Sequence, residues 1–478
     1  MNLKSISLET TSEVFSSHSG LFIFNQLWKS LKLGKKLGSV LPRKKKSRGL
    51  KQVEKLKALV FSFVVGNDCL SDLDVVNRDK LFRELIGGNC SSTSMGDFLR
   101  SFGNRHLERL QEAIIESVVE LRLTLKPEDQ KFVLTMDSTP HEHYAKKMEG
   151  LAWNYKNMWC LDSQNCYDQY GFSYLFDLRA GNTFSGRDSE RWVHEIFKKI
   201  PKGGEKWFRA DSAYSKFTVF EALKTNEVKF AIALKDNIGS YVRRKNKECL
   251  KWEKTSLRFF DSNECEVAMG VYPLEKLGSM RVVFIRAPRE DRQLSLLDDP
   301  SEVNYRHYSI ITNIESSEMS EEEVIEFYRQ RATAENYIRE QKYGYDFLNF
   351  PCRRLKSNQV FGQAGVIAHN LMRALSLMME QKTVMRKGKD GKSRKVVQQG
   401  YFAKKVRNEL IRIAGRVSSS ARKIKVRVNR RYKEVLERMI EQIRTVQLRF
   451  VTYKKLGRDV INSNTSNNPL DYGPGFVT

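Results

Sequence analysis

Four polar side chains recur at helical spacing in the segment 328–342. Intervals of 3, 4 and 7 residues separate Tyr328, Arg331, Glu335 and Lys342. Such intervals bring side chains to one face of a helix, and core helices fill that face with Leu, Ile and Val. Here the face carries a hydroxyl, two cations and a carboxylate. That set suits a site for metal ions and phosphate better than a core.

Two further carboxylates follow short apolar runs. Asp137 ends the run 131–136, and Asp211 ends the run 206–210. Each run is typical of a buried strand, and acids at strand ends of an α/β sheet face the ligand-binding cleft. A single such Asp is more often a turn or cap residue. Three carboxylates together, however, can hold two divalent cations about 4 Å apart for phosphoryl transfer, so we expect Asp137, Asp211 and Glu335 to form one metal site.

Strand and helix patterns alternate around these acids. Strand patterns occupy 131–136, 171–179, 206–210, 229–235 and 306–313, and helical patterns occupy 187–199 and 216–224. This alternation predicts a mixed α/β sheet. From 237 to 304 the helical signal disappears, and short strand patterns at 250–252, 265–272 and 281–286 predict a β-rich insertion.

The patterns divide the chain into five segments. We expect a helical N-terminal DNA-binding domain at 1–127 and the first part of the α/β core at 128–236. The β-rich insertion follows at 237–304, and the second part of the core, with the helix of Glu335, at 305–381. A basic helical region for DNA binding and dimerisation is expected at 382–478, where the segment 421–436 interleaves cations with apolar residues as in a helix that follows a DNA backbone.

The charge is strongly positive and unevenly distributed. The formal net charge is +26, and the last 128 residues contain 29 Lys and Arg against 8 Asp and Glu. Such a surface attracts polyanions, of which nucleic acid is the commonest large one; a merely soluble or ribosome-associated basic protein is the alternative. Seven cysteines without a C-x-x-C pattern indicate a reducing compartment rather than a disulfide framework. No apolar run is long enough to suggest a membrane span.

The acids and their neighbours resemble the DDE transposases of bacterial insertion sequences. In one branch of these enzymes the third acid lies in a Y-x2-R-x3-E-x6-K pattern, which the chain matches at Tyr328, Arg331, Glu335 and Lys342. The first two acids lie in D-x-T and A-D-[SA]-x-[YF] contexts, matched here at 137–139 and 210–214. The resemblance covers roughly residues 20–455.

The resemblance implies an RNase H-like core with a β-strand insertion between the second Asp and the Glu. Asp137, Asp211 and Glu335 would ligate two Mg²⁺ ions, with Mn²⁺ able to take their place. A water would then attack the phosphodiester at a transposon end, and the freed 3′-hydroxyl would attack target DNA, a cut-and-paste reaction. The protein would act on double-stranded DNA as a homodimer in the bacterial cytoplasm, associated with the nucleoid and not with a membrane.

The same resemblance assigns DNA contacts. Tyr328, Arg331 and Lys342 would contact phosphates, together with Arg339 of the same segment. Related transposases hold a flipped base with an aromatic residue of the insertion, and Trp252 is a candidate. A helix-surface ion pair with Glu335, worth less than about 1 kcal/mol, is the alternative role for the two cations Arg331 and Lys342.

Two other functions fit the same residues. One is a related metal-dependent nuclease that cuts without joining. The other is a transposase-derived DNA-binding protein that is catalytically silent, although the intact set of acids argues against it. Strand transfer separates the first of these from a transposase.

Overall fold

A computed structural model describes residues 8–44, 48–289, 304–381, 383–387, 393–397, 400–420 and 423–456. The chain divides into two compact units. The first unit comprises residues 1–113 and 340–452, and the second comprises residues 114–339 and 453–478.

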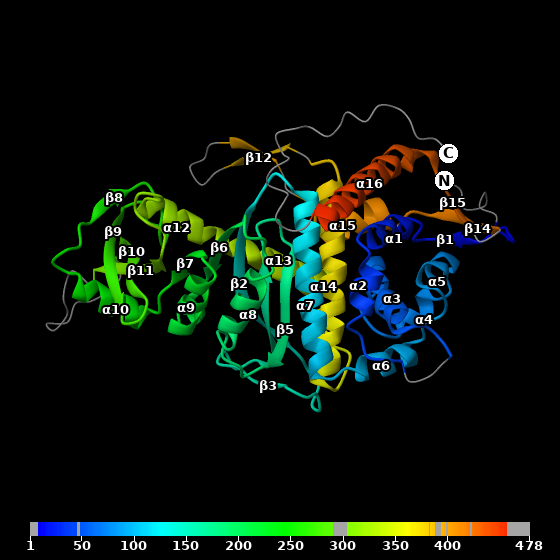
Figure 1. The fold of residues 1–478 in the computed structure, drawn as a ribbon, viewed down its shortest axis with the longest axis horizontal. Helices are drawn as coiled ribbons and strands as arrows, with labels where there is room; N and C mark the ends of the chain where they lie inside the picture. Colours follow the sequence, from blue (N-terminus) through cyan, green and yellow to red (C-terminus); the bar gives the residue numbers. More distant parts are fainter. Residues whose placement is uncertain are drawn as a thin grey trace. The chain divides into compact units, whose positions relative to one another are not determined.

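A ten-stranded mixed sheet forms the centre of the second unit (Figure 1). Its strands are β2 (Lys131–Glu142), β3 (Ala152–Trp153), β4 (Trp159–Tyr167), β5 (Ser173–Ala180), β6 (Glu205–Ala210), β7 (Lys229–Ala233), β8 (Glu253–Thr255), β9 (Cys265–Leu274), β10 (Gly278–Pro288) and β11 (Tyr305–Thr312). They lie in the order β3-β4-β2-β6-β7-β11-β10-β9-β8, and β5 also pairs with β4. The neighbours β2, β6 and β7 are parallel, and the other pairs are antiparallel. The predicted mixed α/β architecture is therefore confirmed.

The helices of this unit lie between the strands and after β11. They are α8 (Ser189–Phe197), α9 (Phe217–Thr225), α10 (Asp236–Lys245), α12 (Glu321–Arg329) and α13 (Thr333–Gly344), whose last residues belong to the first unit. Helix α12 starts with a capping box, because Ser320 accepts from the Glu323 amide and Glu323 accepts from the Ser320 amide. A 3-10 turn, Gln330–Ala332, separates α12 from α13.

The sequence pattern does not predict β4, although this strand lies between β2 and β5. Its middle is polar but almost fully buried, from Asp162 to Asn165. These groups find partners inside the sheet: Arg179 donates to Asp162, and His141 is hydrogen-bonded to Ser163 over 2.7 Å. Because partners remove the cost of burial, a strand without an apolar pattern can lie near the middle of the sheet.

The β-rich insertion differs from its prediction in two ways. Helix α10 lies at its start, so the expected absence of helix is wrong there. Strands β9 and β10 are found as expected, but β10 pairs with β11 and the insertion continues the central sheet. The expected strand at 250–252 lies slightly later, as β8.

The first unit is mainly helical. Its helices are α1 (Leu21–Ser30), α2 (Leu33–Gly38), α3 (Gln52–Val65), α4 (Asp72–Val76), α5 (Lys80–Ile86), α6 (Ser92–Arg100), the start of α7 (Asn104–Leu125), α14 (Leu355–Met378), α15 (Ala403–Val406) and most of α16 (Lys433–Leu456); the rest of α7, from residue 114, belongs to the second unit. Phe63 of α3 packs against Phe361 of α14, with ring centroids 4.8 Å apart. The sequence divides these segments between separate domains, whereas in the structure N-terminal and C-terminal residues share one core.

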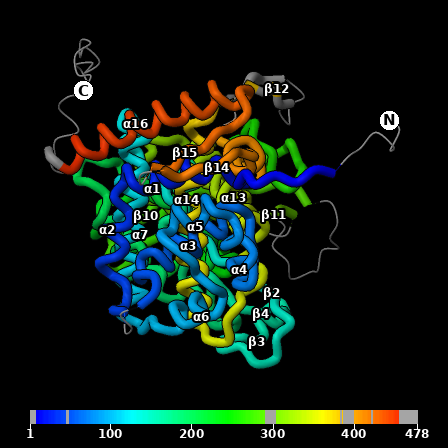
Figure 2. The backbone as a smooth tube through the Cα atoms, turned by 90° about the vertical axis from the view of Figure 1, so that its right-hand side faces the viewer, coloured from blue at the N-terminus to red at the C-terminus, as the bar shows by residue number. Residues whose placement is uncertain are grey.

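The C-terminal region is only partly helical. It contains the hairpin β12 (Thr383–Lys387) and β13 (Ser393–Val397), and β14 (Gly415–Ser420) and β15 (Lys423–Val428) form a sheet with β1 (Phe15–Ser16). In Figure 2 the blue N-terminal part of the tube, which contains β1, runs beside the orange segment of β14, its pairing partner. The helical interpretation of 421–436 is wrong for residues 423–428, which form β15, because cations and apolar residues alternate there with period two. Residues 457–478 of the expected region lie outside the described residues.

Within the described ranges, every helix is too short or too polar to cross a membrane.

Candidate active site

The first two acids lie side by side on parallel strands. Asp137 belongs to β2, and Asp211 immediately follows β6. Their preceding residues, Met136 and Ala210, are register partners, and neighbouring strands lie about 4.8 Å apart. Asp137 accepts from the Ser138 amide over 2.9 Å, and Asp211 caps a 3-10 turn through the Ala213 amide over 2.9 Å. Each carboxylate therefore has one oxygen held by the backbone.

The side chain of Arg331 joins the first acid to the third. One guanidinium nitrogen lies 3.1 Å from Asp137 Oδ2, and the other lies 3.7 Å from Glu335 Oε1. Arg331 is in the 3-10 turn and Glu335 in the first turn of α13. The two carboxylates, distant in sequence, are thus brought within the span of a single guanidinium group.

Burial and mutual repulsion disfavour the charged forms of the two aspartates. Burial, together with repulsion from Asp211, raises the pKa of Asp137 to about 7, although Arg331 opposes both effects. Burial also raises the pKa of Asp211. The side chain of Asp137 is 14% exposed, whereas that of Glu335 is 56% exposed. We call Asp137, Asp211, Glu335 and Arg331 the acidic pocket: the Arg331 guanidinium lies between two of its acids, and Glu335 is the most exposed of the three.

The three oxygen donors fit hard divalent cations, which prefer carboxylate ligands. In this structure the Arg331 guanidinium provides the compensating positive charge. Among the described residues, the one group of three ligand atoms all within 4.8 Å of one another is Asp68, Cys69 and Asp72 of the first unit. The acids around Arg331 are therefore more widely spaced, and a cation would have to draw them together.

The family model described as transposase DDE domain, group 1, matches residues 1–448 of the chain. The chain belongs to this family of transposase DDE domains. The resemblance drawn from the motifs is thereby confirmed at the level of the family, whereas the narrower Y-R-E-K branch stays a prediction. No curated protein matches the chain. Membership of the family implies DNA binding and the use of divalent metal ions.

The signature residues of this DDE domain do not lie on one continuous helix. Tyr328 is near the end of α12, Arg331 is in the 3-10 turn, and Glu335 is on α13. The Tyr328 hydroxyl is hydrogen-bonded to the Tyr308 hydroxyl over 2.6 Å. The expected single helix face is therefore replaced by a break, and such a tight turn within a helix often marks a functional site.

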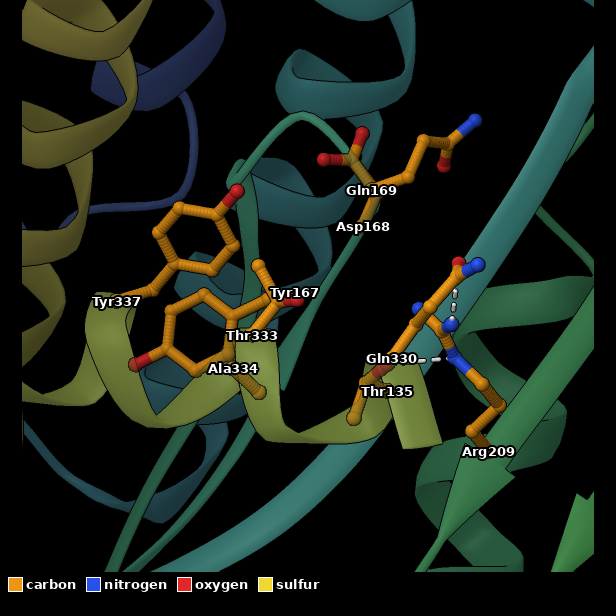
Figure 3. Close-up of a pocket in the computed structure, with 9 residues that line it drawn as sticks. All are labelled: Thr135, Tyr167, Asp168, Gln169, Arg209, Gln330, Thr333, Ala334 and Tyr337. Carbon is orange, nitrogen blue, oxygen red and sulfur yellow. Dashed lines mark hydrogen bonds between the residues drawn. The ribbon is translucent and has the colours of Figure 1, made fainter. Parts of the chain in front are cut away.

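Sequence reasoning missed Arg209, which is hydrogen-bonded to residues at that break. Its side chain is 4% exposed, and burial lowers its pKa to about 10. The guanidinium donates to the Phe327 carbonyl over 3.0 Å and to Gln330 Oε1 over 3.1 Å, and Nε donates to Thr135 Oγ1 over 3.3 Å (Figure 3). A cation at the carbonyl end of α12 also suits the helix dipole. The available signal was a charged residue inside the apolar run 206–210.

Arg209 lies two register positions before the acids. Thr135 pairs with Arg209 just as Met136 pairs with Ala210, and Thr135 and Asp137 lie on the same face of β2 because side chains alternate. Arg209 also lines a cavity of about 170 Å³ with Thr135, Tyr167, Asp168, Gln169, Gln330, Thr333, Ala334 and Tyr337 (Figure 3). This cation thus connects the strand of Asp211 to the turn of Arg331.

The remaining predicted DNA-binding residues lie elsewhere. Lys342 is half-buried and Arg339 is exposed, both further along α13. Trp252 packs in the insertion, where the Arg286 guanidinium lies 4.0 Å from its ring centroid. The structure therefore brings Asp137, Asp211, Glu335, Arg331 and Tyr328 together, and it gives Trp252 a cation across its ring.

Proposed function

We propose that the chain is a cut-and-paste transposase that binds the ends of a mobile element, cleaves them with two metal ions and joins the freed 3′-hydroxyls to target DNA. The observation that carries the proposal is the meeting of Asp137 and Asp211 on neighbouring parallel strands with Arg331 and Glu335 from a broken helix. Family membership independently supports transposase function.

The sheet order supports an RNase H-like core, the fold that the resemblance implies. The central strands lie in the order β5-β4-β2-β6-β7, with antiparallel pairs on the β5 side and parallel pairs on the β7 side. The strand of the first acid is in the middle of this order. A rigid sheet fixes both aspartates, as two-metal chemistry requires.

Different residues of the site would hold the metal ions and the DNA. Asp137, Asp211 and Glu335 would hold two Mg²⁺ ions, which would supply an activated water and stabilise the leaving oxygen. Arg331 offers a planar guanidinium suited to a phosphate group. The Tyr308 hydroxyl orients that of Tyr328 toward the same region. Arg339 and Lys342 add cations along α13.

The aromatic residue that receives a flipped base would be Phe260 rather than Trp252. Phe260 is 53% exposed and has a positive φ of 46°, a conformation that bulky residues rarely adopt and that marks functional turns. Its ring is 4.2 Å from that of Phe259, which lies 5.9 Å from Tyr308. An aromatic series thus leads to Tyr328, whereas Trp252 already stacks with Arg286.

Two related functions are alternatives that the test below separates from transposition. A nuclease would cut the element ends without joining them, and a silent DNA-binding protein would bind without cutting. The acidic pocket favours an enzyme, because buried carboxylates that repel one another gain most from a bound cation. A dimer in the DNA complex would hold two ends together.

The test uses the full chain with overlapping duplex fragments from the DNA that flanks its own coding sequence, a supercoiled target plasmid and Mg²⁺. We expect one fragment from each flank to be cut and joined to the plasmid, and Asp137→Asn to do neither. Nicked fragments without joined products would favour the nuclease. Binding without cutting would favour the silent protein.

A further inference from the structure

The sheet formed by β1, β14 and β15 in the first unit has two unlike faces. Directly paired residues of antiparallel strands share a face. Arg416 pairs with Arg427, Ser418 with Lys425, and Ser420 with Lys423, and all six side chains are exposed. The opposite face carries Val417, which is buried, with Val426 and Val428 half-buried. We call the exposed side, with Arg416, Lys423, Lys425 and Arg427, the cationic face.

The charges of the cationic face are poorly compensated. Arg416 forms an ion pair with Glu13 over 2.7 Å. Within the described part of the chain, no ion pair joins Lys423, Lys425 or Arg427 to a carboxylate. Arg416 and Arg427 also oppose each other directly, and like charges in that position are destabilising. A fold that keeps such a face exposed is stabilised when an anion covers it.

The spacing of the cations suits a regular polyanion. Alternate residues of a strand are about 6.6 Å apart, so the three cations of β15 span about 13 Å in a straight row. A two-stranded ribbon is narrow enough for the major groove of duplex DNA, which is about 12 Å wide. Arg, Lys and Ser are side chains that contact phosphates, whereas Asn and Gln, which read adenine, are missing from the cationic face.

We propose that the cationic face of β14–β15 binds the phosphate backbone of duplex DNA without reading its sequence. The proposal rests on the proposed function and identifies one element that supplies its DNA affinity. An acidic lipid surface is a poorer match, because among the described residues of the cationic face Phe15, which pairs with Arg416, is the one large apolar side chain that could enter a bilayer. The contact would make the binding of element ends and of target DNA equally sensitive to salt.

The test compares two full-length variants that lose the same charge. One is Lys423→Gln, Lys425→Gln and Arg427→Gln; the control is Lys198→Gln, Lys202→Gln and Lys224→Gln, at exposed positions of the second unit. Binding to an element-end duplex and to an unrelated duplex of equal length is measured from about 50 to 200 mM salt. Each lost phosphate contact lowers the slope of log K against log salt by about 0.9.

We expect the first variant to lose roughly 2 to 3 units of slope on both duplexes and the control to keep the wild-type slope. Equal losses in both variants, or a loss confined to the element end, would overturn the proposal. Lys423→Arg with Lys425→Arg should keep the slope, which shows that folding is intact. A variant that loses binding to phosphatidylserine vesicles or to duplex RNA, but not to duplex DNA, would also overturn it.

Cleavage of the element end at low salt and saturating protein keeps the two proposals apart. The control variant should then cut at the wild-type rate, because its acids and its cationic face are unchanged. Wild-type chain that binds duplex DNA through the cationic face but never cuts would contradict the proposed function and leave this inference intact.

Discussion

The acidic pocket and the cationic face use charge in opposite ways. In the pocket, Asp137 and Arg331 are 14% and 20% exposed, and each charge meets an opposite one within 4 Å. On the cationic face, Lys423, Lys425 and Arg427 are exposed and lie on the side where Arg416 faces Arg427. The pocket places one cation between its acids, whereas the cationic face leaves most of its charges for a partner.

This difference determines what salt and substitution should do to each region. Exposed charges are screened over about 8 Å at physiological ionic strength, whereas partly buried pairs are screened much less. Changes in the pocket should therefore affect the chemical step with little dependence on salt. Changes on the cationic face should affect DNA affinity and its salt dependence, with little effect on chemistry at saturation.

The largest expected effect is the loss of cleavage when one acid becomes an amide. Asp137→Asn, Asp211→Asn and Glu335→Gln should each slow single-turnover cleavage by at least about 10³-fold, because metal-ion stabilisation of the transition state is worth several kcal/mol. DNA affinity and its salt slope should stay within a few fold of wild type. Cleavage within tenfold of wild type would remove that residue from the site.

The next effect concerns Arg331 and has two parts of opposite sign. Arg331→Ala should slow cleavage by about 10²-fold, because a donor to the reacting phosphate is lost. Without DNA, however, it should tighten Mn²⁺ binding by about tenfold, since the cation that competes for Asp137 and Glu335 is gone. Isothermal titration with Mn²⁺ measures this change, and Arg331→Lys is the control that keeps the charge. Weaker Mn²⁺ binding by Arg331→Ala would contradict the arrangement.

A smaller effect is expected at Arg209, which acts through the turn that carries Arg331. Arg209→Met removes the bonds to the Phe327 carbonyl and Gln330, and a misplaced turn should lower kcat by about tenfold or more. The DNA dissociation constant and salt slope should not change, which separates this positioning role from a DNA contact. Gln330→Ala removes only the side-chain partner and should have a milder effect. A change in salt slope with unchanged kcat would contradict the assignment.

The smallest effect is on stability and depends on pH. Burial raises the pKa of Asp137 from near 4 to about 7, so the folded chain favours the protonated acid. The resulting stabilisation is complete below pH about 4 and is lost as the pH rises through about 7. With a chelator present, the stability of Asp137→Asn relative to that of the wild type should therefore increase as the pH rises from about 4 to about 7. Thermal unfolding measures this difference. A pH-independent difference would contradict the pKa assignment.

The acids could be predicted from sequence because each lies in a short context that reveals its element. An apolar run before Asp137 or Asp211 predicts a strand end, and parallel pairing then places the two acids together. The helical start at Ser320 was equally readable from its capping box. These signals are local, so they can be recognised in the sequence without knowledge of the fold.

The missed features depend on partners that are distant in sequence. Strand β4 is polar because its side chains bond across the sheet, and Arg209 is buried because it meets a helix end more than a hundred residues later. The break between α12 and α13 contains no Gly or Pro that would mark it in the sequence, and its first residue, Gln330, is a partner of Arg209. In the strand that carries most of the cationic face, the alternation of cations with apolar residues was visible in the sequence, but this interleaving was interpreted as a helix.

Anomalous diffraction from crystals of the full chain with Mn²⁺ and element-end DNA tests the central claim most directly. We predict two Mn²⁺ peaks about 4 Å apart, with oxygens of Asp137, Asp211 and Glu335 among their ligands and the Arg331 side chain turned to a phosphate. Peaks at Asp68 and Asp72, or ions that leave any of the three acids uncoordinated, would contradict it.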